Sequence, residues 1–104
     1  MKRIIEGKQY NTSTAKKICV LKCNEDSGDF RWHSSALYLS PKGTYFIAGK
    51  GNARSRWAEP VGGNAYGPGS GLEIITPEEA RRIAEEALLD EEDMDEAGFL
   101  VEVG

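Results

Sequence analysis

The sequence predicts an α+β protein in which an antiparallel sheet of about four or five strands packs against one main helix near the C-terminus. Two observations carry this prediction. Short apolar runs separated by turn residues fill the first half of the chain, and a helical apolar stripe with a capping motif follows residue 76. With 104 residues, of which 39% are hydrophobic, the chain has material for one modest core, so we expect residues 1–104 to form a single domain.

The most clearly defined strands are expected at residues 31–40 and 44–48. Between them, Pro41 presets the backbone for the first corner of a turn, and Gly43 can take the left-handed conformation that closes a three-residue hairpin loop. Alternation along the first strand predicts two groups of side chains on opposite faces of the sheet: Leu37 and Leu39 on one, and Trp32, Ala36 and Tyr38 on the other.

Shorter apolar runs predict the remaining strands. Residues 18–23 and 72–75 are apolar and rich in β-branched side chains, and residues 3–6 form a short apolar start. Residues 99–103 have aromatic and aliphatic side chains typical of a strand, so we expect this end of the chain to be docked on the protein. Residues 49–71 contain seven of the twelve glycines, which predicts a long loop that is functional or mobile.

The main helix is expected to begin at Thr76. The Thr76 side chain can accept a hydrogen bond from the amide of Glu79, and Pro77 occupies the first helical position, where no amide proton is needed. Apolar side chains then recur at helical spacing and predict a face that packs on the sheet: Ala80, Ile83, Ala84, Ala87 and Leu88.

The sequence has no pattern typical of an enzyme or a metal site. His33 is the one histidine, and the neighbouring Ser34 and Ser35 alternate between the faces of a strand, so they do not form a catalytic triad. Cys19 and Cys23 would lie about 13 Å apart in a strand, too far for a disulfide, and together with His33 they still lack a fourth zinc ligand. We therefore expect a non-enzymatic protein with two free thiols and no metal or cofactor.

Charge is divided unevenly along the chain, whose formal net charge is −4. Residues 1–57 carry a net charge of +7 and residues 58–104 carry −11, which predicts two surfaces of opposite potential. The C-terminal segment 90–104 begins with six acidic side chains that form the candidate partner-binding surface: Asp90, Glu91, Glu92, Asp93, Asp95 and Glu96. The alternative candidate is a basic and aromatic cluster of the kind that binds single-stranded nucleic acid: Lys50, Arg54, Arg56 and Trp57.

Several short motifs follow one another along residues 1–89: Tyr-Asn-Thr-Ser-Thr-Ala-Lys from residue 10, Asp-Phe-Arg from residue 29, Leu-Tyr from residue 37, Gly-Thr-Tyr-Phe from residue 43, Gly-Lys-Gly from residue 49 and Pro-Glu-Glu-Ala from residue 77. In this order they resemble a family of small proteins of bacterial mobile elements and phages. Some members of that family look like anti-CRISPR proteins that inhibit type II effector nucleases. The chain departs from the family pattern with Asn11 for Asp, Ser13 for Glu, Lys50 for Glu and Asn52 for Gly.

The resemblance implies a non-enzymatic inhibitor in the cytoplasm of the bacterial host, which binds a CRISPR effector protein or ribonucleoprotein and blocks its nucleic-acid-binding surface. Because such a surface is lined by Lys and Arg, we expect residues 90–96 to face it and Lys50, Arg54 and Arg56 to lie on the opposite side. The alternative is a nucleic-acid-binding accessory protein of a mobile element or phage. The sequence has no apolar run of membrane-spanning length, so no membrane partner is expected.

Overall fold

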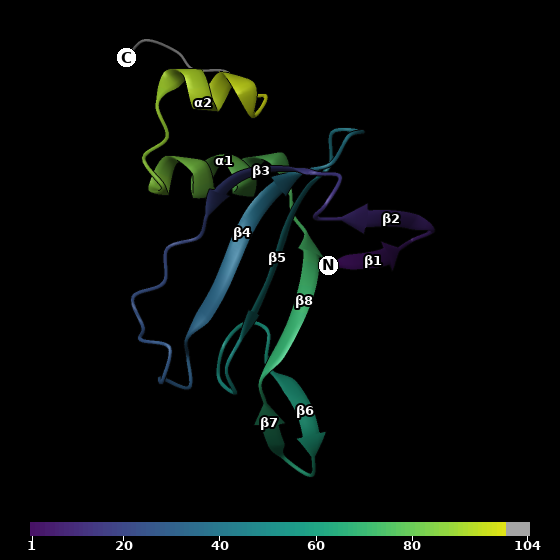
Figure 1. Ribbon diagram of the computed structural model, residues 1–104, viewed down its shortest axis with the longest axis vertical. Helices are drawn as coiled ribbons and strands as arrows, with labels where there is room; N and C mark the ends of the chain where they lie inside the picture. The colour runs from purple at the N-terminus through teal and green to yellow at the C-terminus, as the bar shows by residue number, and fades with distance from the viewer. Residues whose placement is uncertain (100–104) are drawn as a thin grey trace.

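Four antiparallel strands form the main sheet, in the order β3-β4-β5-β8, and two helices follow the last strand (Figure 1). This computed structural model describes residues 1–99 and confirms the predicted α+β class. The strands and helices are β1 (Lys2–Ile5), β2 (Lys8–Asn11), β3 (Lys16–Val20), β4 (His33–Leu39), β5 (Tyr45–Gly51), β6 (Glu59–Gly62), β7 (Ala65–Gly67), β8 (Gly69–Ile74), α1 (Pro77–Glu86) and α2 (Glu91–Glu96).

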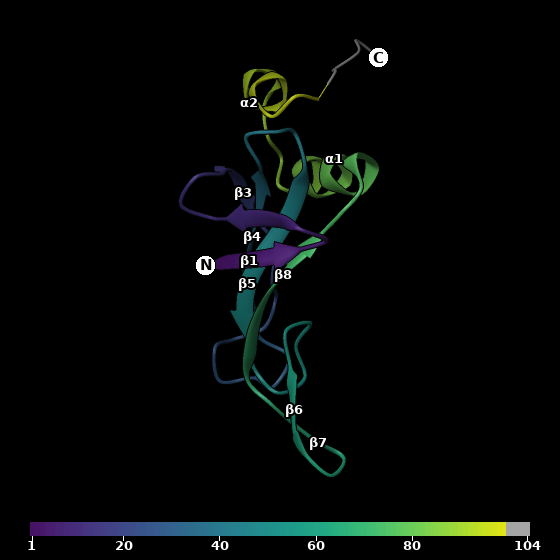
Figure 2. The same ribbon diagram turned by 90° about the vertical axis from the view of Figure 1, so that its right-hand side faces the viewer.

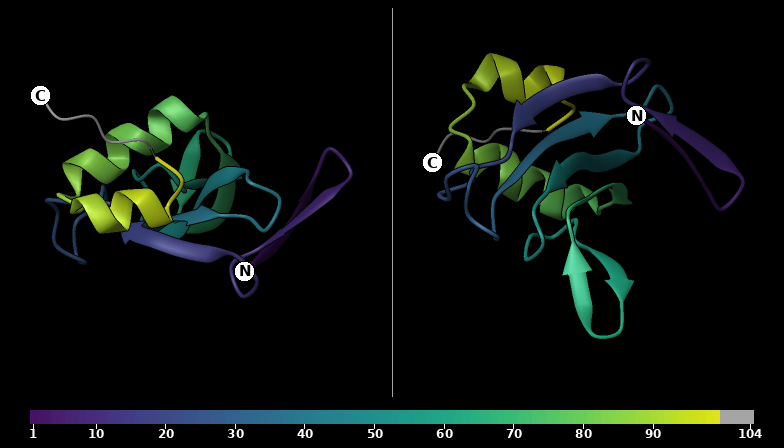
Figure 3. Two further views of the ribbon diagram at one scale, coloured as in Figure 1. Left: turned by 90° about the horizontal axis from the view of Figure 1, so that it is seen from above. Right: turned by 60° about the horizontal axis from the view of Figure 1, so that its bottom comes forward.

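Two short hairpins, β1–β2 and β6–β7, lie outside the main sheet. Seen from above, the helices and the β1–β2 hairpin lie on opposite sides of the molecule (Figure 3). The β6–β7 hairpin projects from the end of the sheet that is farther from the helices (Figure 1, Figure 2). The two ends of the main sheet are therefore built differently, with a packed helical end and an extended hairpin end.

The β4–β5 hairpin forms at the predicted turn. Gly43 adopts φ +91°, and its amide donates to the carbonyl of Ser40 at 3.0 Å, while the Ser40 amide donates to the carbonyl of Thr44 at 2.8 Å. β5 continues to Gly51, beyond the expected end at residue 48, because its backbone pairs with β4 on one side and with β8 on the other.

Side chains alternate between two faces of the main sheet, and the grouping predicted for β4 is confirmed for Leu37 and Leu39 against Tyr38. We call the face that packs against the helices the helix-side face and the other one the open face. The buried residues of the helix-side cluster are Leu37, Tyr45, Ile47, Trp57, Ile75, Ala80, Ala84, Met94, Ala97 and Phe99. The smaller open-face cluster contains Tyr10, Phe46, Ala48 and Leu72.

Helix α1 begins as predicted, with the Thr76 hydroxyl accepting from the Glu79 amide at 3.2 Å. Ala80 and Ala84 are fully buried against the sheet. Leu88, expected to close the apolar stripe, lies beyond the helix and is 88% exposed. The chain leaves the helical path there because Leu88 adopts φ +59°. The amide of Leu88 donates a hydrogen bond to the carbonyl of Glu85, and the amide of Leu89 donates one to the carbonyl of Ala84, so these last carbonyls of the helix are capped.

The acidic segment folds into a second helix, where the sequence predicted only an acidic surface. The Asp90 side chain accepts from the Asp93 amide at 2.8 Å and caps α2. Met94 and Ala97 are buried beneath it, and the ring of Phe99 stacks on Tyr45 with centroids 5.1 Å apart. Phe99 is thus docked as expected but lies outside any strand, while residues 100–103 of the predicted strand fall outside the described residues.

The glycine-rich stretch at 49–71 is mostly ordered strand rather than one long loop. Gly49 and Gly51 belong to β5, and Gly69 and Gly71 belong to β8. A Cβ atom added to Gly71 would lie 2.8 Å from Cε3 of Trp57, so the glycines leave room for the Trp57 loop to lie directly on the helix-side face. The prediction of one long loop at 49–71 was wrong, because it counted the glycines and did not consider their alternate spacing along strands.

Strand β3 ends at Val20, earlier than the expected residue 23. Cys19 therefore lies within the sheet and Cys23 beyond it, and both thiols are half-buried and free. Burial raises the pKa of the Cys19 thiol above its ordinary value, which makes this thiol less reactive.

Candidate interaction surfaces

The two helices together present a layer of carboxylates, which we call the acidic helical layer (residues 77–86 and 90–96). The helical segments contain nine acidic side chains and two arginines, and Asp90 adds a tenth carboxylate as the cap of α2. All ten of these carboxylate side chains are exposed. The structure therefore concentrates the negative charge on one layer of the molecule.

The acidic side chains predicted from the sequence have different roles on α2. Asp90 is a structural cap, and Glu96 pairs with Lys16 of β3 at 3.6 Å. Among residues 1–99, Glu91, Glu92, Asp93 and Asp95 take part in no ion pair. These four carboxylates are available to a partner, and the buried Met94 and Ala97 fix the helix that carries them.

The predicted basic cluster is not brought together. The alternation of β5 directs Lys50 to the open face, where it lies between Ser34 and Ser70 in the strand register. Arg54 is exposed on the loop after β5, and Arg56 lies on the helix-side face, where its guanidinium pairs with Glu73 at 3.2 Å. Lys50 is thus opposite the helices as expected, but Arg56 is on the same face as α1.

Trp57 is a core residue, which removes it as a stacking platform for a nucleic-acid base. It is 7% exposed, and Arg56 lies 5.3 Å from the centre of its ring. The indole nitrogen donates to the hydroxyl of Ser35 at 2.7 Å. The alternative cluster proposed from the sequence therefore loses its aromatic member.

A buried polar network joins Trp57 to the histidine of the chain. The Ser35 hydroxyl is 3% exposed and lies 2.8 Å from Nδ1 of His33 as well as next to the Trp57 indole. Since Ser35 accepts from Trp57, it can donate to a neutral His33, and burial together with the charge of Arg56 lowers the pKa of His33. The network orders the sheet and the loop; its buried serine is not placed as a nucleophile.

The sequence contains a signal for this network that our predictions did not use, which is the two-residue spacing of several residues. His33 and Ser35 are two residues apart on one strand, so they share a face. The same spacing recurs in Gly49 and Gly51 and again in Gly69 and Gly71. Two alternating glycine pairs in neighbouring strands indicate a bulky group lying on that face.

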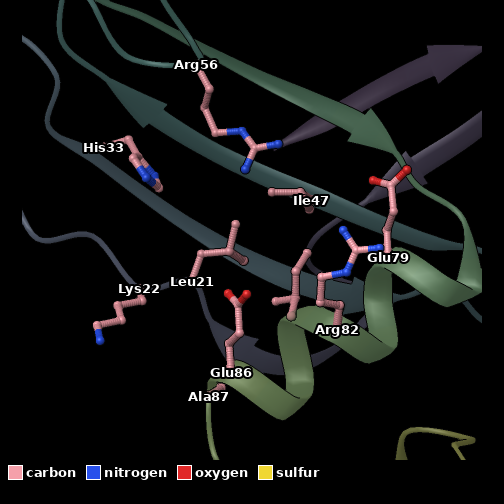
Figure 4. Close-up of a pocket in the computed structure, with 10 residues that line it drawn as sticks. Leu21, Lys22, His33, Ile47, Arg56, Glu79, Arg82, Glu86 and Ala87 are labelled. Atoms are coloured by element: carbon pink, nitrogen blue, oxygen red, sulfur yellow. The ribbon is translucent and has the colours of Figure 1, made fainter.

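A hollow of about 320 Å³ lies between the helix-side face and α1 (Figure 4). Leu21, Ile47 and Ile83 give it an apolar floor. In Figure 4, His33 and Arg56 enter from the sheet side, while α1 supplies charged groups of both signs on the other side. The charged and polar residues around the hollow are Lys22, His33, Arg56, Glu79, Arg82 and Glu86. This balance of charges favours no single class of ionic ligand.

No family model, curated protein or solved structure matches the chain. Within residues 1–99, no group of three or more His, Cys, Asp or Glu side chains is arranged to hold a metal ion. In the same part of the chain, neither helix has the length and apolar character needed to cross a lipid bilayer.

Proposed function

We propose that the protein is a non-enzymatic inhibitor of a CRISPR effector, and that it covers part of the effector's nucleic-acid-binding surface with the acidic helical layer. The observation that carries this proposal is that Glu91, Glu92 and Asp95 are exposed, unpaired within residues 1–99, and mounted on a helix anchored in the core by Met94. The sequence resemblance to proteins of mobile elements and phages suggests the target.

Electrostatics gives the physical reason. A nucleic-acid groove is lined by Lys and Arg side chains that hold phosphates, and a dense group of carboxylates is attracted to the same side chains. Because α2 is fixed by its cap and by buried side chains, its carboxylates lose little conformational freedom on binding. The acidic layer can therefore compete for the groove as a preformed surface. The proposed site of action is the bacterial cytoplasm, where the effector works.

The test compares three forms of the protein for binding to a purified type II effector, with and without its guide RNA. The first is the wild type, the second carries Glu91→Gln, Glu92→Gln and Asp95→Asn, and the third is a control with the same change in net charge. The control neutralises exposed carboxylates outside the layer: Glu6→Gln, Asp26→Asn and Glu59→Gln. Asp90 and Glu96 are left intact because they support the fold.

We expect the α2 variant to bind about tenfold more weakly and with a flatter salt dependence, and the control to bind like the wild type. Equal binding by all three forms would contradict the proposal. An equal loss in the α2 variant and the control would show that net charge matters and that the helical layer does not.

A further inference from the structure

The open face of the main sheet is only partly covered by the rest of the chain. The β1–β2 hairpin packs over one part, where Tyr10 meets the ring of Phe46 edge-on with centroids 5.7 Å apart. Beside it lies a groove of about 300 Å³, and small side chains make up part of its lining. Ala36 and Ala48 lie opposite each other there, and Ser34 and Ser70 flank the central strand β5. Val20 and Tyr38 also line the groove, and the small side chains between them leave it open.

The charges along this groove all have one sign. Among the described residues, Lys17 and Lys50 are the charged side chains that line it, and no carboxylate does. Glu59 belongs to the adjoining hollow, which Lys50 also lines. The groove is thus a basic surface on a protein whose net charge is negative.

The strand register places no carboxylate across from either lysine. Lys50 has Ser34 and Ser70 as its cross-strand neighbours, and Lys17 has Tyr38. A lysine that served only to stabilise the sheet would gain most from a carboxylate across the strand. Within residues 1–99 neither side chain makes an ion pair, so both ammonium groups are free to bind an anion.

We propose that this groove binds the phosphate backbone of a single-stranded nucleic acid. Ammonium groups and hydroxyls are the groups that proteins use to hold phosphodiester oxygens, and Lys17, Lys50, Ser34 and Ser70 supply both kinds. The groove is small, about 300 Å³, and Met1 and Thr12 beside the β1–β2 hairpin line it, so we expect it to hold one strand in preference to a duplex. The acidic helical layer lies on the other side of the sheet, so its repulsion acts least here.

Fluorescence anisotropy with short labelled oligouridine RNA, oligothymidine DNA and a DNA duplex tests this inference. The variant Lys17→Gln with Lys50→Gln removes both ammonium groups, and Lys22→Gln with Lys42→Gln is a control with the same charge change elsewhere on the surface. All four side chains are exposed, and melting temperatures will establish that both variants fold.

We expect the single strands to bind the wild type at about 50 mM salt and to be released towards about 200 mM. The plot of log affinity against log salt should lose about 0.7 in slope for each groove lysine removed, and the control should keep the wild-type slope. The inference would be overturned by absence of binding at the lower salt, by equal losses in variant and control, or by tighter binding of the duplex. RNA and DNA binding equally would fit backbone recognition, and a preference for RNA would add a contact to the 2′-hydroxyl.

Discussion

The packing of Trp57 and its loop explains several of the glycines in strands β5 and β8. Trp57 lies on Gly71, donates to Ser35 through its indole nitrogen and carries the Arg56 guanidinium over its ring. Gly51, Gly69 and Gly71 are therefore packing residues, because a side chain at these positions would collide with Trp57 or with residues next to it in the chain. A side chain at Gly49 would collide with Ser34 and Ser35 of β4 instead.

Replacing Gly71 with alanine should destabilise the protein by about 1–3 kcal/mol, because the new Cβ would press on the Trp57 ring. Gly28→Ala is the matched control, since a Cβ at Gly28 would have no heavy atom within 4 Å. Urea denaturation followed by tryptophan fluorescence measures both. Equal stabilities for the two variants would contradict the placement of Trp57.

His33 should make the folded protein sensitive to mild acid. Its pKa is lowered by burial and by Arg56, from an ordinary value of about 6.5. The unfolded chain then takes up the proton more readily, so this contribution to stability is complete above about pH 6.5 and is lost as the pH falls through the folded-state pKa.

Melting temperatures of the wild type and of His33→Gln, measured between about pH 7.5 and about pH 5, isolate this effect from that of the carboxylates that both proteins share. The wild type should lose stability relative to the variant as the pH falls. Parallel curves, or a relative gain by the wild type in acid, would show that His33 is not held in its neutral form.

The two helices end in the same way with different residues. After each helix, one residue adopts a left-handed conformation: Leu88 after α1 and Gly98 after α2. The amide of this residue and the amide of the next residue each donate a hydrogen bond to a carbonyl in the last turns of the helix. Glycine suits this conformation, whereas leucine is strained in it. Leu88 is also exposed, so its side chain contributes little packing in return.

Leu88→Gly should therefore raise the free energy of unfolding by about 1 kcal/mol. The control is Leu89→Gly at the next position, which packs against the core and does not have a positive φ. Chemical denaturation should show that the first change stabilises and the second destabilises. A loss of stability in Leu88→Gly would mean that this helix end differs from the one described.

The elements that the sequence predicted best depend on neighbouring residues alone. The Thr76 cap and the turn at Gly43 are complete within a few residues, so local chemistry determines them. Helix α2 was missed because its five acidic side chains and the capping Asp90 obscure the buried pair Met94 and Ala97. The position of Trp57 depends on strands far from it in sequence, which no local pattern specifies.

The same distinction applies to the candidate surfaces. The sequence shows six acidic side chains in one segment, but it could not separate the capping Asp90 and the paired Glu96 from the unpaired Glu91, Glu92, Asp93 and Asp95. It grouped Lys50 with Trp57 by proximity in the chain. In the structure, strand alternation directs Lys50 to the open face, whereas the loop after β5 packs Trp57 on the helix-side face. Lys17 and Lys50 line the same groove because the sheet brings β3 and β5 together, although the two residues are far apart in the sequence.

Across the protein as a whole, the sheet separates two surfaces of opposite charge. The acidic helical layer lies on one side, and the groove with Lys17 and Lys50 lies on the other. The division seen along the sequence is thus partly preserved in space, although the ion pairs Lys16–Glu96 and Arg56–Glu73 join the two halves. Binding of a protein through the helices and binding of a single-stranded nucleic acid in the groove are separate proposals. Each has a variant that leaves the other surface intact.

A competition measurement on the purified type II effector, loaded with its guide RNA, tests the proposed inhibition. If the acidic helical layer covers the nucleic-acid-binding surface, labelled target DNA and this protein should exclude each other, and more DNA should be needed to displace the wild type than the variant with Glu91→Gln, Glu92→Gln and Asp95→Asn. A stable complex in which the effector holds both the target DNA and this protein, with DNA affinity unchanged, would contradict the proposal.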